Sequence, residues 1–187
     1  GEYARERTTE YLRSLVELGV TGFRLDGAKH MHQNDIQQII DAVNAFANDN
    51  GYATPYFFLE VIDEGSGSVN ADEYSDLAMG DITEFKYGLY LAEQFRYGDI
   101  DNFEYQVSGF SWNGEAPLDT AEAVVFVDNH DNQRSHYFYP AYDAHVLTHK
   151  LDMENNQYVL GNVFMLAWPY GRPRVMSSYD FDNKNQG

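Results

Sequence analysis

The sequence contains no cysteine. This excludes disulfide bonds, thiolate nucleophiles and cysteine-ligated metals. Basic side chains are also scarce, with 12 lysines and arginines against 30 aspartates and glutamates and a formal net charge of -18. Binding to nucleic acid needs a basic surface, so we expect no nucleic-acid partner. The same deficit and the absence of any apolar run long enough to span a bilayer lead us to expect no membrane association.

What the sequence does contain is an alternation of helical patterns and short apolar runs. Helices are expected over residues 3–18, about 36–50, 88–95 and 157–167, with Asn34 and Gln37 as a capping pair for the second. Strands are expected over residues 20–25, 56–61, 82–85, 123–127 and 174–177. Continuous apolar strands are typical of a parallel sheet covered on both faces. The alternation therefore predicts an α/β fold.

Two α/β architectures fit this order, a doubly wound sheet and a barrel. A doubly wound sheet normally carries a glycine-rich phosphate loop after its first strand. Here that strand is followed by DGAKHMHQN, which has no such loop. A barrel is therefore favoured, and five strands make only part of one. The chain starts inside a helical pattern without an initiating Met and stops in the polar turn DNKNQG, so we interpret it as an internal fragment without a signal peptide.

Three acidic residues stand at the ends of apolar runs. They are Asp26 in GVTGFRLDGAKH, Glu60 in PYFFLEVIDEG and Asp131 in AVVFVDNHDNQR. Parallel barrels place catalytic residues at the carboxyl ends of their strands. One such residue alone is more often a helix cap or a surface group. Three in succession indicate an active site, because clustered carboxylates repel one another unless chemistry uses them.

Two carboxylates in unlike surroundings can hydrolyse a glycosidic bond. Arg24 and Lys29 lie close in sequence to Asp26 and favour its ionised form, as a nucleophile requires. The apolar run before Glu60 favours the protonated form that a general acid needs. Asp131, flanked by His130 and Asn132, could hold sugar hydroxyl groups.

The segments GFRLDGAKH, FFLEVI and FVDNHD resemble, in the same order, three conserved regions of the α-amylase family, glycoside hydrolase family 13. The resemblance implies a partial (β/α)8 TIM barrel, about strands 4 to 8. Residues 1–187 would be the C-terminal part of the catalytic barrel domain, without the N-terminal strands, the inserted domain and the C-terminal β domain. It also implies retaining endo-hydrolysis of α-1,4-glucosidic bonds in starch and glycogen.

The same resemblance implies a role for each matching residue. Asp26 would be the nucleophile, Glu60 the general acid/base and Asp131 the transition-state stabiliser. Substrate-site residues would be Arg24, Lys29, His30, Ile62, His130 and His136. The partner would be an α-glucan, and the complete protein would be extracellular and monomeric.

A finer resemblance, to animal-type chloride-dependent members, is carried by EVIDEG, TEFKYG, FVDNHDNQR and PYGRPRVMSSYDF. It implies a chloride held by Arg24, Asn129 and Arg174, and a calcium bound to the backbone carbonyl of His30. The chain departs from that pattern at Gly27, where alanine is more usual. It also lacks a glycine-rich loop after NQR, and it has no cysteine. These departures lead us to expect a bacterial member.

Two rival functions remain open at this point. An α-glucosidase or a transglycosidase could use the same barrel. A non-catalytic family member acting as a binding subunit is disfavoured, because such proteins usually lose a catalytic carboxylate and this chain keeps all three. The isolated fragment is expected to be inactive, since part of the barrel is missing.

Overall fold

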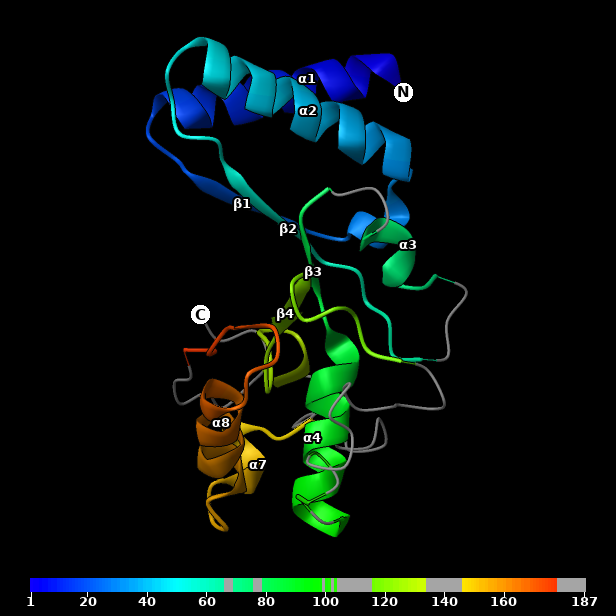
Figure 1. Cartoon of the computed structure of the whole chain (residues 1–187), viewed down its shortest axis with the longest axis vertical. Helices are drawn as coiled ribbons and strands as arrows, with labels where there is room; N and C mark the ends of the chain where they lie inside the picture. Colours follow the sequence, from blue (N-terminus) through cyan, green and yellow to red (C-terminus); the bar gives the residue numbers. More distant parts are fainter. Residues whose placement is uncertain are drawn as a thin grey trace. The chain divides into compact units, whose positions relative to one another are not determined.

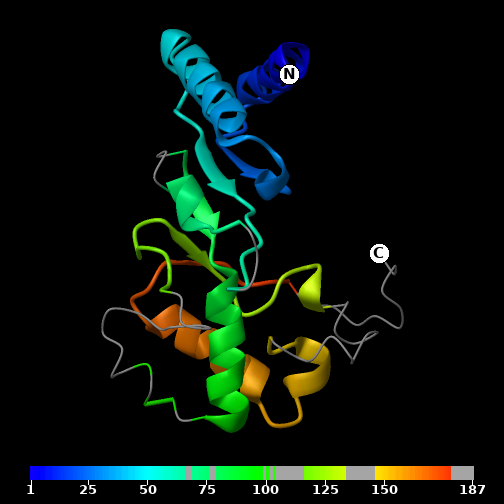
Figure 2. The same cartoon turned by 90° about the vertical axis from the view of Figure 1, so that its right-hand side faces the viewer.

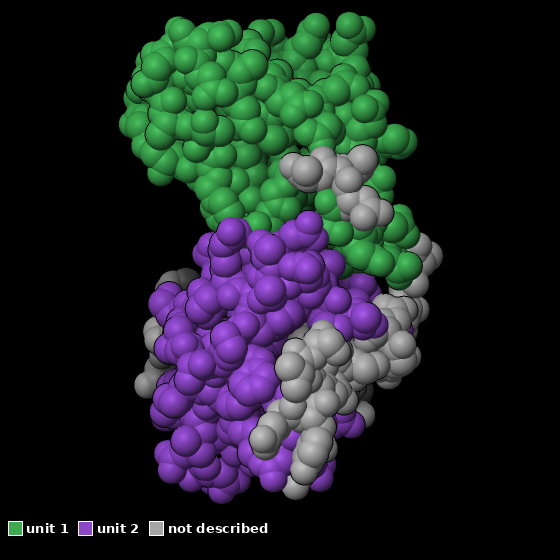
Figure 3. Space-filling view, in the orientation of Figure 1, with its two compact units in different colours: residues 1–62, 68–83 green, residues 63–67, 84–187 purple. Residues whose placement is uncertain are grey.

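A computed structural model describes residues 1–65, 69–75, 79–98, 100–101, 103, 116–133 and 146–177 (Figure 1). The chain divides into two compact units (Figure 3). Unit 1 comprises residues 1–62 and 68–83, and unit 2 comprises residues 63–67 and 84–187. Helices and parallel strands alternate in both units, as the sequence predicts.

Unit 1 is built on three parallel strands. They are β1 (Gly22–Leu25), β2 (Tyr56–Leu59) and β3 (Asp81–Thr83), with Gly22 opposite Tyr56 and Phe58 opposite Asp81. Its helices are α1 (Glu2–Glu17), the 3-10 turn η1 (Ala28–His30), α2 (Gln33–Asp49) and the short α3 (Asp72–Ser75). The carboxyl ends of β1 and β2 therefore lie side by side, and the candidate residues follow these ends.

Helices α1 and α2 lie alongside each other (Figures 1 and 2). Their apolar stripes form the buried core of this layer, with Leu12, Val16, Ile36, Ile39, Ile40 and Val43. An ion pair between Arg5 and Asp35 and a hydrogen bond of 3.1 Å from Arg13 Nη2 to the Ala42 carbonyl add polar links. Packing against α1 holds α2 in place, and the position of α2 limits the path of the loop that connects it to β1.

Unit 2 is built around α4 (Phe85–Tyr97) and α8 (Gln157–Ala167). It also contains β4 (Ala123–Val125), α7 (His149–Asp152) and β5 (Arg172–Pro173), and β4 and β5 pair in parallel with Val124 opposite Arg172. Its core includes Leu89, Leu91, Val124, Val125, Leu147 and Met165. The segment that follows β4 carries Asp131.

One glycine in unit 1 is required by a close approach of two strands. Gly80, just before β3, has φ +141°, and a Cβ there would lie 2.5 Å from the Phe57 carbonyl oxygen of β2. Such a distance is a severe clash with backbone atoms, so only glycine lets β3 approach β2 in this way.

Several element boundaries differ from the sequence-based expectation. The capping pair was misplaced, because α2 begins at Gln33 and is capped by His32, whose Nδ1 accepts a hydrogen bond of 3.2 Å from the Asn34 amide. Gln37 instead donates to Asp41. Helix α4 begins at Phe85 because the Glu84 side chain accepts from the Lys86 amide and caps it there.

The first and last strands also differ. The strand expected over 174–177 is wrong in position, because β5 covers Arg172–Pro173 and Arg174 adds one hydrogen bond of 2.8 Å from its amide to the Val125 carbonyl. Strand β1 was expected to be buried, yet Gly22 and Arg24 are exposed. Among the described strands, β1 pairs with β2 alone, so one of its edges is uncovered. Helices α3 and α7 have no counterpart in the sequence-based expectation.

Candidate active site

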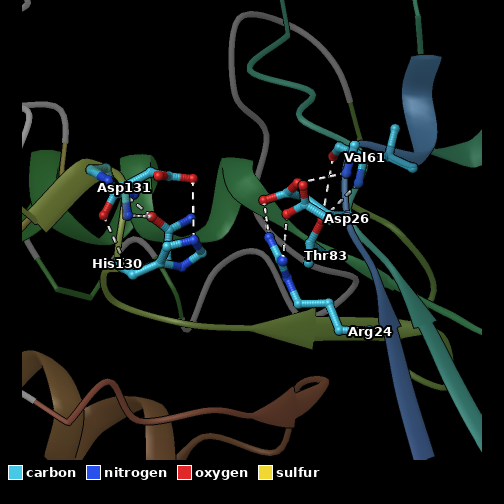
Figure 4. Close-up of polar contacts among 10 residues, drawn as sticks. Arg24, Asp26, Val61, Thr83, His130 and Asp131 are labelled. Carbon is cyan, nitrogen blue, oxygen red and sulfur yellow. Dashed lines mark hydrogen bonds and ion pairs between the residues drawn. The ribbon is translucent and has the colours of Figure 1, made fainter.

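Asp26 leaves the end of β1 with its side chain in solvent. The side chain is 77% exposed, and its Oδ1 accepts a hydrogen bond of 2.5 Å from Arg24 Nη1 (Figure 4). The next residue, Gly27, has φ +56°, which turns the chain sharply from β1 into η1. The turn leaves the Asp26 carboxylate accessible while a guanidinium holds it, as an ionised nucleophile would need.

Glu60 leaves the end of β2 with its side chain buried. The main chain extends the β1–β2 ladder, since the Glu60 amide donates to the Leu25 carbonyl and the Ala28 amide donates to the Glu60 carbonyl, both at 2.9 Å. The side chain is only 6% exposed. Its Oε1 pairs with Arg24 Nη2, and its Oε2 accepts a hydrogen bond of 2.9 Å from the Gly27 amide.

Arg24 therefore bridges the two predicted catalytic carboxylates, one exposed and one buried. This changes the expected surroundings of Glu60. Apolar residues precede it in the sequence, but its carboxylate oxygens contact a guanidinium and a backbone amide. Successive strand side chains point to opposite faces, so sequence neighbours are not the contacts of the carboxylate.

The predicted substrate residues of unit 1 follow the same two strands. Lys29 lies in η1, and its Nζ is 3.5 Å from the Ile62 carbonyl oxygen in the segment after β2. His30 is exposed at the end of η1. Within the described residues, no three His, Cys, Asp or Glu side chains gather to hold a metal ion.

In unit 2, Asp131 sits on a tight polar turn. The Asn129 Oδ1 accepts hydrogen bonds of 2.9 Å from the amides of both Asp131 and Asn132, and Asn132 Oδ1 accepts one of 2.7 Å from the Asn129 amide. Asp131 is 67% exposed, and its Oδ2 is 3.5 Å from His130 Nε2 (Figure 4). Both local amides bind the Asn129 oxygen, and among the described residues its NH2 group makes no hydrogen bond, so this group can be presented to a ligand.

The sequence analysis missed Asp128, the buried carboxyl that precedes this turn. Asp128 is 2% exposed and accepts hydrogen bonds from Gln133 Nε2 at 2.7 Å and from the Tyr158 hydroxyl at 3.0 Å. Burial raises the pKa of Asp128 to about 6, and the two hydrogen bonds partly oppose that shift. Its place directly after the apolar run 123–127 was the available signal.

Two further predicted residues remain, Arg174 and His136. Arg174 follows β5 and is exposed, with its main chain bonded to Val125. His136 lies outside the described residues. The structure thus brings Arg24, Asp26 and Glu60 together in unit 1, and Asn129, His130 and Asp131 together in unit 2.

Comparison with known proteins identifies the family. No protein-family model matches the chain. The α-amylase of Phaedon cochleariae is 40% identical over 190 residues, which cover 100% of this chain and 36% of that protein. The wild-type α-amylase I of Eisenia fetida superposes with a TM-score of 0.81 at 34% identity, over 100% of this chain and 38% of the other. The chain belongs to the α-amylase family.

The family places the fold as part of an α-amylase barrel, which confirms the predicted fold class. The chain spans 34–36% of the length of the curated relatives that it matches. A second Eisenia fetida structure, a glutamate-to-glutamine mutant of α-amylase I in complex with maltohexaose, has a TM-score of 0.77 at 35% identity and covers 97% of this chain and 35% of that one. These animal relatives do not support the expected bacterial source.

None of the helices in the described ranges has the length and apolarity to cross a membrane.

Proposed function

We propose that this chain carries the catalytic carboxylates of a retaining, endo-acting α-amylase that hydrolyses α-1,4-glucosidic bonds in starch and glycogen. The observation that carries the proposal is the Arg24 guanidinium shared by an exposed Asp26 and a buried Glu60, within a chain of the α-amylase family. Residues 1–187 would be the C-terminal part of the catalytic barrel domain.

The unlike exposure of the two carboxylates supports unlike roles. Asp26, exposed and held by a guanidinium, would attack the anomeric carbon and form a covalent glycosyl-enzyme. Glu60, buried beside it, would give its proton to the departing glycosidic oxygen and then take one from the attacking water. Asp131 would stabilise the charged sugar in the transition state. A glutamate-to-glutamine mutant of a relative, α-amylase I of Eisenia fetida, forms a complex with maltohexaose.

The pairing of Glu60 with Arg24 poses a problem for an acid, because a guanidinium favours the ionised carboxylate. We propose that Arg24, Asn129 and Arg174 would hold a chloride ion. Guanidinium groups and an amide NH2 are donors suited to an anion, and the local bonds of the Asn129 oxygen leave its NH2 end for this purpose. When bound, chloride would supply negative charge that offsets the guanidinium.

The remaining assignments are part of the same proposal. The α-glucan would contact Lys29, His30, Ile62, His130 and His136, in addition to Arg24. The His30 carbonyl would be one ligand of a calcium ion, whose preference is for oxygen ligands. The complete protein would act outside the cell as a monomer, by likeness to the family.

Replacement of Glu60 tests the function. In the complete protein, Glu60→Gln should abolish starch hydrolysis while the fold survives, because glutamine keeps the shape but can neither donate nor accept the proton. Glu17→Gln, at an exposed position on α1, is the matched control and should keep full activity. Hydrolysis by Glu60→Gln at the parent rate would refute the assignment.

The products separate the endo-acting enzyme from its rivals on the same barrel. Internal cleavage of soluble starch should release a mixture of short maltooligosaccharides. Mostly glucose would indicate an α-glucosidase, and longer or branched products would indicate a transglycosidase.

A further inference from the structure

Unit 2 contains a buried carboxylate that the proposed mechanism does not use. Asp128 lies between the end of β4 and the turn that carries Asp131, and only 2% of it is exposed. Both side-chain oxygens have partners, Gln133 Nε2 at 2.7 Å and the Tyr158 hydroxyl at 3.0 Å. Gln133 and Tyr158 are themselves buried, so water cannot readily replace these bonds if one partner is lost.

Gln133 links this carboxylate to the turn. Its side chain donates to Asp128, and its main-chain amide donates to the Asn129 carbonyl at 3.0 Å. The Asn129 side chain in turn accepts from the Asp131 and Asn132 amides. Asp128 therefore anchors, through one residue, the turn that orients Asn129 and Asp131.

The charges around Asp128 make it a costly anchor. The nearby carboxylate of Asp152 raises the pKa of Asp128 further, although Asp152 itself is paired with Arg96 at 2.8 Å. Among the described residues, no cation pairs with Asp128 directly. The ring of His149 contacts Tyr158, not Asp128, at 6.1 Å between ring centres. Burial of an apolar or amide side chain at this position would cost less free energy than burial of a carboxylate, so packing alone does not explain the aspartate.

We propose that Asp128 is a positioning residue for the candidate transition-state stabiliser Asp131 and the candidate anion ligand Asn129, and that it acts through Gln133. The hydrogen bond from the Gln133 side chain to the buried carboxylate sets the place of Gln133, and the main-chain amide of Gln133 closes the turn. The inference rests on the proposed function, since it assigns Asp128 to the same site.

Two substitutions in the complete protein test the linkage. Asp128→Ala removes the carboxylate that accepts from Gln133 and Tyr158, and Gln133→Leu removes the link itself. Both should lower kcat by about ten-fold to a hundred-fold, because a small displacement of a reacting group is costly, with a smaller change in KM. Both should also weaken activation by chloride. Their double mutant should be no worse than either single variant, because both remove the same linkage.

Tyr158→Phe is the matched control. It removes the other hydrogen bond of Asp128 without touching the turn, so it should lower the midpoint of thermal unfolding and leave kcat and the chloride response unchanged. Asp128→Asn should lose less activity than Asp128→Ala, since a rotated Gln133 amide can still bond to asparagine. Should Asp128→Ala fail to fold, Gln133→Leu and Asp128→Asn carry the same comparison.

Hydrogen–deuterium exchange of the amides of residues 129–133 gives a readout that needs no activity. Exchange should accelerate there in Asp128→Ala and Gln133→Leu and stay slow in Tyr158→Phe. Unchanged exchange, or a kcat that falls equally in all three variants in proportion to stability, would overturn the inference. If the parent does not hydrolyse starch, the proposed function fails on its own, and exchange still decides whether Asp128 orders the turn.

Discussion

The guanidinium of Arg24 contacts the buried carboxylate of Glu60 while its other terminal nitrogen holds the exposed Asp26. A planar fork can serve two carboxylates at once, and a lysine ammonium on a flexible stem cannot hold the same geometry. Arg24→Lys should therefore lower kcat/KM on starch by about a hundred-fold, because both carboxylates lose their common support. Steady-state kinetics on soluble starch will measure this loss of kcat/KM.

Arg7→Lys is the control for that prediction. Arg7 forms an exposed ion pair with Glu10 on α1, where either cation suffices. Equal kinetics in Arg24→Lys and Arg7→Lys would show that the bridge is not needed.

The chloride proposal predicts a specific loss at position 174. Arg174→Gln removes one guanidinium from the proposed anion site, so activation by chloride should disappear and activity should become independent of added salt at low concentration. Titration of chloride against initial rate will measure it. Arg172→Gln, two residues earlier on β5, should keep the activation. Full activity of the parent in chloride-free buffer would contradict the proposal.

Stability should depend on pH through Asp128. Burial raises its pKa from 3.8 to about 6, so between these values the folded chain keeps a proton that the unfolded chain has lost. The contribution is present below pH 4 and is lost as the pH rises through 6. The loss amounts to about 3 kcal/mol, since each pKa unit corresponds to 1.36 kcal/mol.

Urea unfolding of the parent and of Asp128→Asn across this range will test that prediction. Asparagine does not titrate, so the stability of the parent relative to the variant should fall as the pH rises from 4 to 7. A constant difference across the range would mean that Asp128 does not titrate on folding.

The ion pair between Lys86 and Asp63 is buried in unit 2, with 3.2 Å between Nζ and Oδ2. Lys86→Met should destabilise the protein by about 3–5 kcal/mol, because it leaves a buried carboxylate without its cation. Adding Asp63→Asn should recover part of that loss. A double-mutant cycle of denaturant unfolding will show it, and strictly additive effects would mean that the pair does not interact.

Gly80 should resist replacement for steric reasons. Gly80→Ala sets a Cβ 2.5 Å from the Phe57 carbonyl oxygen, so the strands must separate and the unfolding midpoint should fall sharply. Gly51 also has a positive φ, +72°, but nothing lies within 4 Å of its Cβ position. Gly51→Ala should cost only the backbone strain, about 1 kcal/mol. Similar midpoints for the two variants would show that the clash relaxes without cost.

The sequence predicted the order of the longer helices and the strands, and the ends of β1 and β2 that carry Asp26 and Glu60, because both follow from local periodicity and from the rule for parallel strands. The sequence did not predict the side-chain contacts that form only in the folded structure. The N-cap of α2 is His32 and not Asn34, because the Nδ1 of the His32 ring accepts a hydrogen bond from the Asn34 amide. The partners of Glu60 come from β1 and the residue after Asp26, 36 and 33 positions away in sequence. The spacing of apolar residues along the chain gives no information about contacts between residues so far apart in sequence.

Asp128 was missed for a related reason. An aspartate after an apolar run reads as a surface residue unless its partners are known, and Tyr158 lies 30 positions away in α8. Even Gln133, 5 positions away, becomes an evident partner only when the turn at residues 129–132 is seen.

The bond from the Gly27 amide to Glu60 has a consequence for how this site can be studied. Its donor is the main-chain amide of Gly27 and its acceptor is the Glu60 side chain, so no side-chain substitution at position 27 removes the donor itself. Replacing Glu60 alters the acceptor of this bond and the partner of Arg24 at the same time, so that substitution does not separate the two contributions. The contribution of this bond becomes measurable only by changing the backbone itself, for example with an ester in place of that amide.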